Sequence, residues 1–412
     1  MIRSKVALSL IGPTLVLTSA CEREPSASDE PPPLVQAELE TGYPQLDAAC
    51  RGPVAEPTHL VVTSTDFNTG AVGLVELATR EVHPDLALAS SDAVPFVHDT
   101  ANPRVFIVNR FGFDYIDELD PREALALVHE FAITPASTAA AANPQAIAID
   151  PAGRGWVSLF GVGELQQFRF PTLAAARPSA SLALDLRDFA DDDGIPELGK
   201  VIGCGDHLFV SAERIDRSSW TPADETLLIP VLGGGNPRLF EFDGDHPGAD
   251  AIALRGVGIG AWRLAPDDPD GHTILVLNSG LERVDLATGI SEWVVDEQTF
   301  IDWGYERLQL ADFDLDPDAR IWISAATEDF SSYQLLRLDL SGTEPQLVTE
   351  FEGLQSVTGA LEIVGYEAWF ADTTIGSSGL RVFDLGQGEV VEFLLSPLPI
   401  GLPPMSLAPL SL

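Results

Sequence analysis

The stretch NPQAIAIDPAGRGWVSLFGVGELQQFRF, residues 143–170, decides the fold. Its apolar residues alternate with polar ones, stop at an Asp-Pro-x-Gly turn and resume in a second run. Most of this pattern returns at residues 311–340 as ADFDLDPDARIWISAATEDFSSYQLLRLDL. The copies align without a gap and match Asp150 with Asp316, Pro151 with Pro317, Arg154 with Arg320, Trp156 with Trp322, and Ser158 with Ser324. Such a duplication predicts a repeated structural unit.

The same unit, a short turn followed by an apolar strand, occurs seven times along the chain. Its equivalent positions are Val61, Phe106, Trp156, Phe209, Leu275, Trp322 and Trp369. They lie 45, 50, 53, 66, 47 and 47 residues apart, which is the period of β-propeller blades with one insertion in the fourth unit. Further strands ending in hairpin signals follow the copies, so four antiparallel strands fit each unit.

These observations predict an all-β protein whose residues 58–395 form a seven-bladed β-propeller. Six or eight blades would follow if the fourth-unit insertion or the weak first unit is misread. A blade buries both faces against its neighbours, so the array must close on itself. Prolines in the C-terminal tail, residues 396–412, prevent a helix, and we expect this tail to lie against the folded body.

Two segments carry a family resemblance. IDPAGRGWVS is similar to the strand-turn-strand segment of NHL, YVTN and gluconolactonase-type propellers, in which an Asp-Pro-x-Gly turn precedes a Trp-Val strand. LDLRDFADDDGIPE and GDHLFVSAERIDRSSWTP together resemble predicted propeller lipoproteins of myxobacteria and their relatives. These resemblances imply a fold and a location, and little chemistry.

The N-terminus resembles a bacterial lipoprotein signal peptide. Basic residues precede an apolar run at residues 6–16, and LTSAC follows, ending at Cys21. The resemblance implies that residues 1–20 are removed and that Cys21 receives the lipid. Thr18 departs from the family pattern, which prefers leucine there. A plain secretory signal with an incidental cysteine is the alternative.

Residues 21–57 are rich in Glu, Pro and Ser and predict an extended tether behind the lipid anchor. No other segment is long and apolar enough to span a bilayer. Glu22 follows the lipidated cysteine instead of the Asp that resembles an inner-membrane retention signal. We therefore expect a protein of the cell envelope, anchored outside the cytoplasm in the outer membrane.

The charge balance argues against one class of partner. The chain has 23 basic and 63 acidic residues, a formal net charge of −40. A phosphate backbone would be repelled at long range, so we expect no nucleic acid partner.

An acidic loop, DFADDDGIPE at residues 188–197, is the candidate metal site. Hard cations prefer several carboxylates on a flexible turn, so Asp191, Asp193 and Glu197 are candidate calcium ligands. The match to a calcium loop is partial, because Phe189 and Lys200 fall on its first and last ligand places. The alternative is a solvated loop between the third and fourth blades.

Two enzymatic classes deserve comparison with the sequence. Gluconolactonase-like hydrolases hold a divalent metal at the mouth of the central channel through Glu, Asn and Asp, and Asn109, Asn278 and Asp372 follow second strands here. The family's Glu-Gly-Pro segment is missing, so no metal residue can be carried over. VDLATGISEW, residues 284–293, reproduces a quinone-dehydrogenase docking motif, but the other hairpins lack its tryptophan, which favours a plain hairpin turn.

The expected function is binding or scaffolding of a protein, polysaccharide or cation, with the metal-dependent hydrolase as the alternative. The fourth-unit insertion, residues 213–237, is the expected rim, and Arg217 and Trp220 are its candidate anchors. Trp220 folding this loop back onto its blade is the competing interpretation. Cys50 and Cys204 remain after lipidation, and they form either one disulfide or two separate buried thiols.

Overall fold

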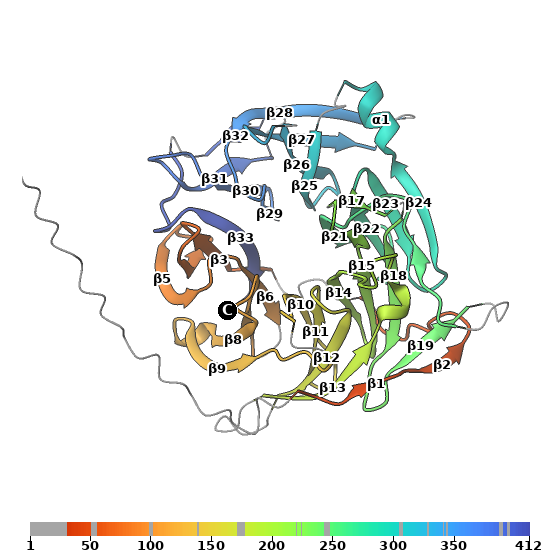
Figure 1. The fold of residues 1–412 in the computed structure, drawn as a ribbon. Helices are drawn as coiled ribbons and strands as arrows, with labels where there is room; N and C mark the ends of the chain where they lie inside the picture. Colours follow the sequence, from red (N-terminus) through yellow and green to blue (C-terminus); the bar gives the residue numbers. More distant parts are fainter. Residues whose placement is uncertain are drawn as a thin grey trace, which may run out of the picture.

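The computed structural model describes residues 31–50, 56–98, 102–137, 140–170, 178–219, 221–223, 225–242, 248–304, 308–327, 329–340, 342, 345–386, 390–393 and 396–412. Within them the chain is a closed ring of seven antiparallel sheets, which confirms the predicted seven-bladed propeller (Figure 1). Cys21 and the expected signal peptide lie outside the described residues. No helix among the described residues is long and apolar enough to cross a membrane.

The blades are numbered in chain order, and their strands run from the axis outward. Blade one contains β33 (Pro404–Leu410), β3 (His59–Thr65), β4 (Gly70–Glu76) and β5 (Val82–Ala89). Blade two contains β6 (Ala93–His98), β7 (Arg104–Asn109), β8 (Tyr115–Asp120) and β9 (Ala126–Ala132). Blade three contains β10 (Pro144–Ile149), β11 (Arg154–Leu159), β12 (Glu164–Arg169), β13 (Ser179–Asp185) and β1 (Leu34–Val35).

Blade four carries the predicted insertion. It contains β14 (Leu198–Cys204), β15 (His207–Ala212), β18 (Leu227–Leu232), β19 (Arg238–Glu241) and β2 (Glu38–Thr41), and β20 (Ile252–Ala253) pairs with β18. The insertion holds a small hairpin, β16 (Ile215–Asp216) with β17 (Thr221–Pro222). Because β18 is the third strand of the blade, the insertion ends near residue 226, earlier than the expected boundary at 237.

The remaining three blades have four strands each. Blade five contains β21 (Ala261–Leu264), β22 (Thr273–Leu277), β23 (Leu281–Asp285) and β24 (Ile290–Val295). Helix α1 (Glu297–Asp302) leads to blade six, with β25 (Leu308–Leu315), β26 (Ile321–Thr327), β27 (Tyr333–Asp339) and β28 (Gln346–Leu354). Blade seven contains β29 (Leu361–Val364), β30 (Glu367–Asp372), β31 (Gly379–Asp384) and β32 (Val391–Glu392).

The repeated positions all lie on the second strand of their blades. Trp156, Trp322 and Trp369 are almost fully buried, each against the following blade. Apolar clusters of this kind fill the spaces between all seven neighbouring pairs of blades. The core of the protein is therefore a ring of interfaces, as stacked repeats require.

A buried Asp carboxylate holds the duplicated turn in each copy. The buried carboxylate of Asp150 accepts hydrogen bonds from the backbone N–H of Ala152 and Arg154, from Arg154 Nε at 2.6 Å and from Trp156 Nε1 at 3.2 Å. Asp316 repeats the arrangement and accepts from Trp322 Nε1 at 3.1 Å. One carboxylate thus holds the turn and the tryptophan that packs against the next blade.

The C-terminal tail differs from the expectation that the propeller ends at residue 395. β33 is the innermost strand of blade one and pairs antiparallel with β3, which joins the two ends of the chain in one sheet. Pro404 and Pro409 lie on an edge strand, because β33 pairs only with β3 among the described strands, and edge strands are where prolines are tolerated within sheets.

The expected tether, residues 21–57, also differs in its described part. We call residues 31–50 the N-terminal strap. Its β1 pairs in parallel with β13 and its β2 with β19, at the outer edges of blades three and four. Backbone pairing at a sheet edge needs no periodic apolar pattern, which is why composition alone suggested a free tether. The strap ends in a disulfide between Cys50 and Cys204, the bridged arrangement of the two considered.

Candidate functional site

The strand order gives the ring two distinct faces. We call the face that carries the turns between second and third strands the front face. The innermost strands begin there, as the pairing of Ala93 with Asn109 shows in blade two. Turns between first and second strands lie on the opposite, back face, where Cys204 pairs with His207.

Large apolar side chains protrude from the front face of four neighbouring blades. We call them the apolar arc, and they lie in the turns of blades six, seven, one and two: Phe330, Ile375, Phe67, Phe111 and Phe113. Ile375 is 97% exposed and Phe111 is 70% exposed. Single exposed apolar residues are common on protein surfaces. Exposed apolar residues that recur at the same turn of successive blades form a larger patch, and such patches mark interaction surfaces.

Three residues of the arc hold a strained backbone. Phe67, Phe111 and Phe330 have φ values of 66°, 53° and 53°, in the left-handed region that bulky residues rarely adopt. Hydrogen bonds from their N–H groups to Thr65 Oγ1, Asn143 Oδ1 and the Thr327 carbonyl fix these turns. Strain of this kind collects at functional sites, because selection for stability alone would place Gly or Asn there.

Acidic residues accompany the arc. Asp66 precedes Phe67 and Asp329 precedes Phe330, and both carboxylates are exposed. Backbone hydrogen bonds from Thr69 and Asn68 lower the pKa of Asp66, and hydrogen bonds from Ser331 and Thr327 lower the pKa of Asp329. The arc is therefore apolar with fixed negative charges beside it.

Arg217, a candidate anchor on the expected rim, makes its contacts within the chain. Its Nε lies 2.7 Å from Glu197 Oε1, its Nη2 donates to the Phe160 carbonyl at 2.7 Å, and its guanidinium covers the Phe160 ring. Arg217 thus fastens the insertion onto blade three and covers the aromatic ring that would extend the arc. Trp220, the other expected anchor, lies outside the described residues.

The same contacts involve the candidate calcium ligands. Glu197 is buried and paired with Arg217, while Asp191 and Asp193 accept backbone N–H groups of their own turn. Burial raises the pKa of Glu197 to about 7, against the opposing effect of the Ile215 N–H and Arg217. No group of three metal-binding side chains occurs among the described residues. The acidic loop is held as a turn, and its carboxylates do not converge.

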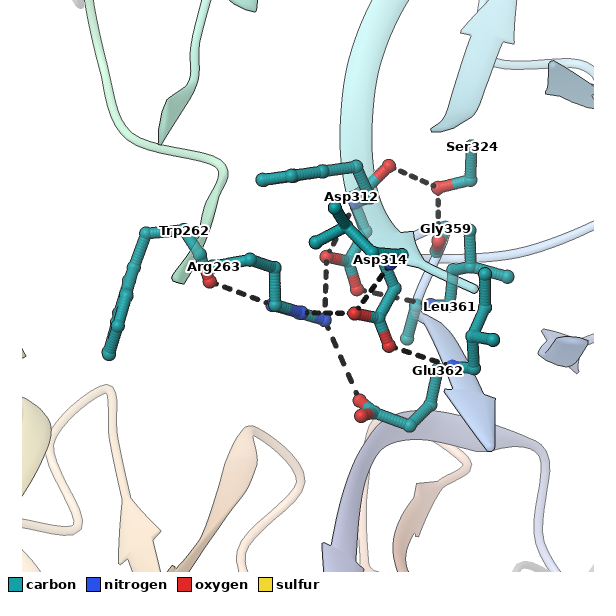
Figure 2. Close-up of polar contacts among 12 residues, drawn as sticks. Trp262, Arg263, Asp312, Asp314, Ser324, Gly359, Leu361 and Glu362 are labelled. Atoms are coloured by element: carbon teal, nitrogen blue, oxygen red, sulfur yellow. Dashed lines mark hydrogen bonds and ion pairs between the residues drawn. The ribbon is translucent and has the colours of Figure 1, made fainter. Parts of the chain in front are cut away.

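A second group of polar residues lies near the axis, and we call it the axial cluster. The innermost strands carry Lys200, Arg263, Asp312, Asp314 and Glu362, and Arg110 and Glu213 directly follow second strands. In Figure 2, Arg263 of β21 reaches the carboxylates of β25 and β29. Its Nε donates to Asp314 Oδ1 at 2.8 Å, and its Nη2 lies 3.6 Å from Glu362 Oε2. Burial opposes its charge, but these carboxylates and Asp312 outweigh burial and raise its pKa.

Asp312 and Asp314 also join blade six to blade seven. Their Oδ2 atoms accept the N–H groups of Leu361 at 3.1 Å and Ile363 at 2.8 Å (Figure 2). Three carboxylates, of Asp312, Asp314 and Glu362, thus lie around Arg263, a cation of the chain itself.

Lys200 and Glu213 complete the axial cluster in blade four. Neither side chain makes a hydrogen bond or ion pair with any other described residue, and both are half-buried. Burial lowers the pKa of Lys200, whereas Glu213 and Asp312 raise it and Arg110 and Arg263 lower it. Burial raises the pKa of Glu213 to about 7, while Lys200 and Arg110 act to lower it. Burial therefore shifts the pKa values of both side chains while no described residue pairs with either of them directly.

The hydrolase candidates Asn109, Asn278 and Asp372 do not meet. Each is buried at the front end of its own second strand and serves the turn that follows. Asn109 Nδ2 donates to Asp117 at 3.0 Å, Asn278 bonds Glu282, and Asp372 pairs with Arg381. The quinone-type segment is a hairpin turn, in which Asp285 Oδ1 accepts the N–H groups of Ala287 and Thr288.

Sequence reasoning missed both the apolar arc and the axial cluster. A usable signal exists for the arc, because TDFNT in the first unit and EDFSS in the sixth place Asp-Phe at the same turn. For the axial cluster only the charges within otherwise apolar first strands, as in LGKVIGC and AWRL, point to polar contacts near the axis.

Similar solved structures support the fold. The periplasmic gluconolactonase PpgL of Pseudomonas aeruginosa has a TM-score of 0.58 and 15% sequence identity, covering 86% of this chain and 99% of that one. A protein from Lactobacillus plantarum has a TM-score of 0.56 and 11% identity, covering 86% of this chain and 100% of that one. No family model and no curated protein matches the sequence. At these identities the likeness shows the β-propeller fold alone.

Proposed function

We propose that the chain is an extracytoplasmic, lipid-anchored propeller that binds a protein partner on the apolar arc. The observation that carries this proposal is the presence of exposed, partly strained Phe67, Phe111 and Phe330 at one turn of neighbouring blades. The partner would have an apolar patch bordered by Lys and Arg. That chemistry complements both the arc with its Asp66 and Asp329 and the net charge of −40.

A protein fits the arc better than a small ligand does. The arc spans four blades and protrudes from the front face, whereas small-molecule sites are concave. Exposed aromatic side chains are typical anchors of protein interfaces.

The location is part of the same proposal. Lipidation at Cys21 would attach the chain to the outer membrane ahead of the strap. The strap contacts the outer edges of blades three and four and ends at Cys50 on the back face, where the Cys50 N–H donates to the Gly271 carbonyl. The front face is left uncovered by these residues, so an anchored propeller could present it to a partner.

Site-specific photo-crosslinking in intact cells tests the docking face. A photoreactive residue replaces Phe67, Phe111 or Phe330 in turn, and Ile290 and Tyr366, exposed apolar residues of the back face, serve as matched controls. The expected result is one shared crosslinked protein from the three front positions and not from the controls. The purified partner should bind at least about tenfold more weakly to Phe330→Ser, and more weakly as salt rises. Crosslinks of equal yield from both faces would exclude the arc as the binding surface.

Mass spectrometry of the mature N-terminus tests the anchor separately. A diacylglycerol-modified Cys21 is expected, and Cys21→Ala should release the protein from the membrane fraction. An unmodified N-terminus at any other residue would contradict the lipid anchor while leaving the docking face untouched.

A further inference from the structure

A pocket on blade four is separate from both the apolar arc and the axial cluster. It has a volume of about 460 Å³ and is lined by Glu40, Thr41, Gly42, Tyr43, Gln45, His207, Leu232 and Phe240. The size falls within the usual range of about 300–1,000 Å³ for small-ligand sites. One wall comes from the N-terminal strap and the other from β15, β18 and β19 of the blade.

His207 is the unusual residue of this pocket. It is 7% exposed, and its Nδ1 is buried without a hydrogen-bond partner. No hydrogen bond joins its Nε2 to any described residue either. Buried polar groups are nearly always paired, so an unpaired imidazole lining a pocket indicates a missing ligand.

The pocket is close to electrically neutral. Burial lowers the pKa of His207, and the opposing charges of Asp47, Asp206 and Glu40 do not offset it. The remaining charge, on Glu40, is paired with Arg238. Neither a phosphate nor a free metal cation therefore meets an unpaired opposite charge here.

The other lining groups offer ring faces and hydrogen bonds. Tyr43 stacks on Phe242 with ring centroids 4.4 Å apart, and it keeps 40% of its surface exposed. Gln45 donates its Nε2 to the Tyr43 carbonyl, so its Oε1 remains available as an acceptor. Thr41 supplies a hydroxyl, and the buried Phe240 supplies an apolar wall behind His207.

We propose that this pocket binds a neutral sugar residue, whose ring lies against Tyr43 and whose hydroxyls pair with His207 and Gln45. Sugars combine an apolar ring face with uncharged donors and acceptors, which matches a neutral pocket with aromatic walls and an unpaired imidazole. The proposal does not depend on the partner at the apolar arc, because the pocket lies on blade four and the arc lies on blades six, seven, one and two.

The disulfide holds the two walls of the pocket together. Cys204 precedes His207 by three residues, and Cys50 follows Gln45 by five. Breaking this bond frees the strap wall to move. We therefore expect the sugar to bind the reduced protein more weakly than the oxidised protein.

NMR of the His207 ring in the oxidised full-length protein tests the proposal. The probes are glucose, galactose, N-acetylglucosamine and maltose, with inorganic phosphate and calcium chloride as charged alternatives. At least one sugar should shift the His207 resonances saturably. Titration calorimetry, which does not depend on the His207 signal, should show that Tyr43→Ser and His207→Leu each weaken that binding roughly tenfold, as expected for one lost contact. Reduction of the disulfide should weaken it in the same direction.

Two controls separate binding from folding. His207→Leu removes a buried polar group that has no partner, so its midpoint of denaturation should not fall. Tyr43→Ser alters an exposed ring, and Phe330→Ser on the front face should leave sugar binding unchanged. Saturable shifts with phosphate or calcium alone, or no shift with any sugar at millimolar concentration, would overturn the assignment.

Discussion

Arg217 and Glu197 form an ion pair, 2.7 Å from Nε to Oε1, that fastens the insertion of blade four to its own blade and to blade three. Glu197 is completely buried, while Arg217 is partly exposed. Arg217→Ala would leave a buried carboxylate without its cation and should lower the free energy of unfolding by about 2–3 kcal/mol. Urea denaturation measures the free energy of unfolding. The paired variant Arg217→Met with Glu197→Gln should regain most of the lost stability. An equal loss in Arg217→Ala and in the paired variant would contradict the role of Arg217 as the cation of a buried carboxylate.

The duplicated turns should respond alike to mutation. Asp150→Ala and Asp316→Ala each remove a buried carboxylate that accepts hydrogen bonds from two backbone N–H groups and a tryptophan Nε1 and that forms an ion pair with an arginine. We expect each to lower the free energy of unfolding by about 2–4 kcal/mol, since several charge-assisted bonds are lost at once. Arg154→Met, which removes a partly exposed partner only, should cost about 1 kcal/mol. A large difference between the two Asp variants would show that the turns are not equivalent.

The sequence predicted the parts of the fold that repeat. Trp156 and Trp322 lie at matching positions because one local network, from turn carboxylate to indole, serves both blades. Contacts that occur once could not be found this way. The closing strand at residues 404–410 is apolar, but its prolines argued against a strand. They are compatible with one because β33 is the edge strand of its sheet.

The site was less predictable, for a similar reason. Arg263 meets Asp314 and Glu362 through strands of three different blades, and that meeting depends on the register of each strand along the axis. Arg217 carries no sequence signal that separates a free rim anchor from a partner of the buried Glu197. Asp-Phe at residues 66–67 and 329–330 could have been recognised, because it recurs at one place in the repeat.

Glu213 should make stability depend on pH. Its pKa is about 7 in the folded protein against 4.5 normally, because burial disfavours the charged form. Between these pH values the folded state holds a proton that the unfolded state has lost. The stability contributed by protonated Glu213 is therefore complete below about pH 4.5 and falls as pH rises through 7. Glu213→Gln should therefore reduce the stability difference between about pH 5 and about pH 8 by about 1–3 kcal/mol.

Chemical denaturation of both proteins across this range provides the measurement. Lys200→Met removes the cation that most lowers the pKa of Glu213, so it should move the loss of stability to higher pH. Identical pH profiles for the wild-type protein and Glu213→Gln would show that Glu213 titrates normally.

The disulfide should hold the strap more than the ring. Cys50 and Cys204 are 154 residues apart in sequence, and closing so long a loop is expected to stabilise a protein by about 2–5 kcal/mol. In Cys50→Ser, hydrogen exchange should accelerate in β2 and the rest of the strap, while the second strands of the blades keep their protection. Exchange that accelerates equally in all blades would indicate that the disulfide supports the ring as a whole.

Phe330 of the apolar arc allows binding and folding stability to be measured separately. Phe330 sits at φ 53° with 62% of its surface exposed, so its ring contributes little burial while its backbone is unfavourable. Asn adopts this conformation at lower cost, and Phe330→Asn should raise the free energy of unfolding by about 0.5–1 kcal/mol. Ile375 has no positive φ, so Ile375→Asn should leave stability within about 0.5 kcal/mol of the wild type. If both variants lose crosslinking to the partner while only the first gains stability, the phenylalanine is kept for contact at the expense of the fold. A Phe330→Asn protein that is less stable than the wild type would mean instead that the ring packs usefully in the folded state.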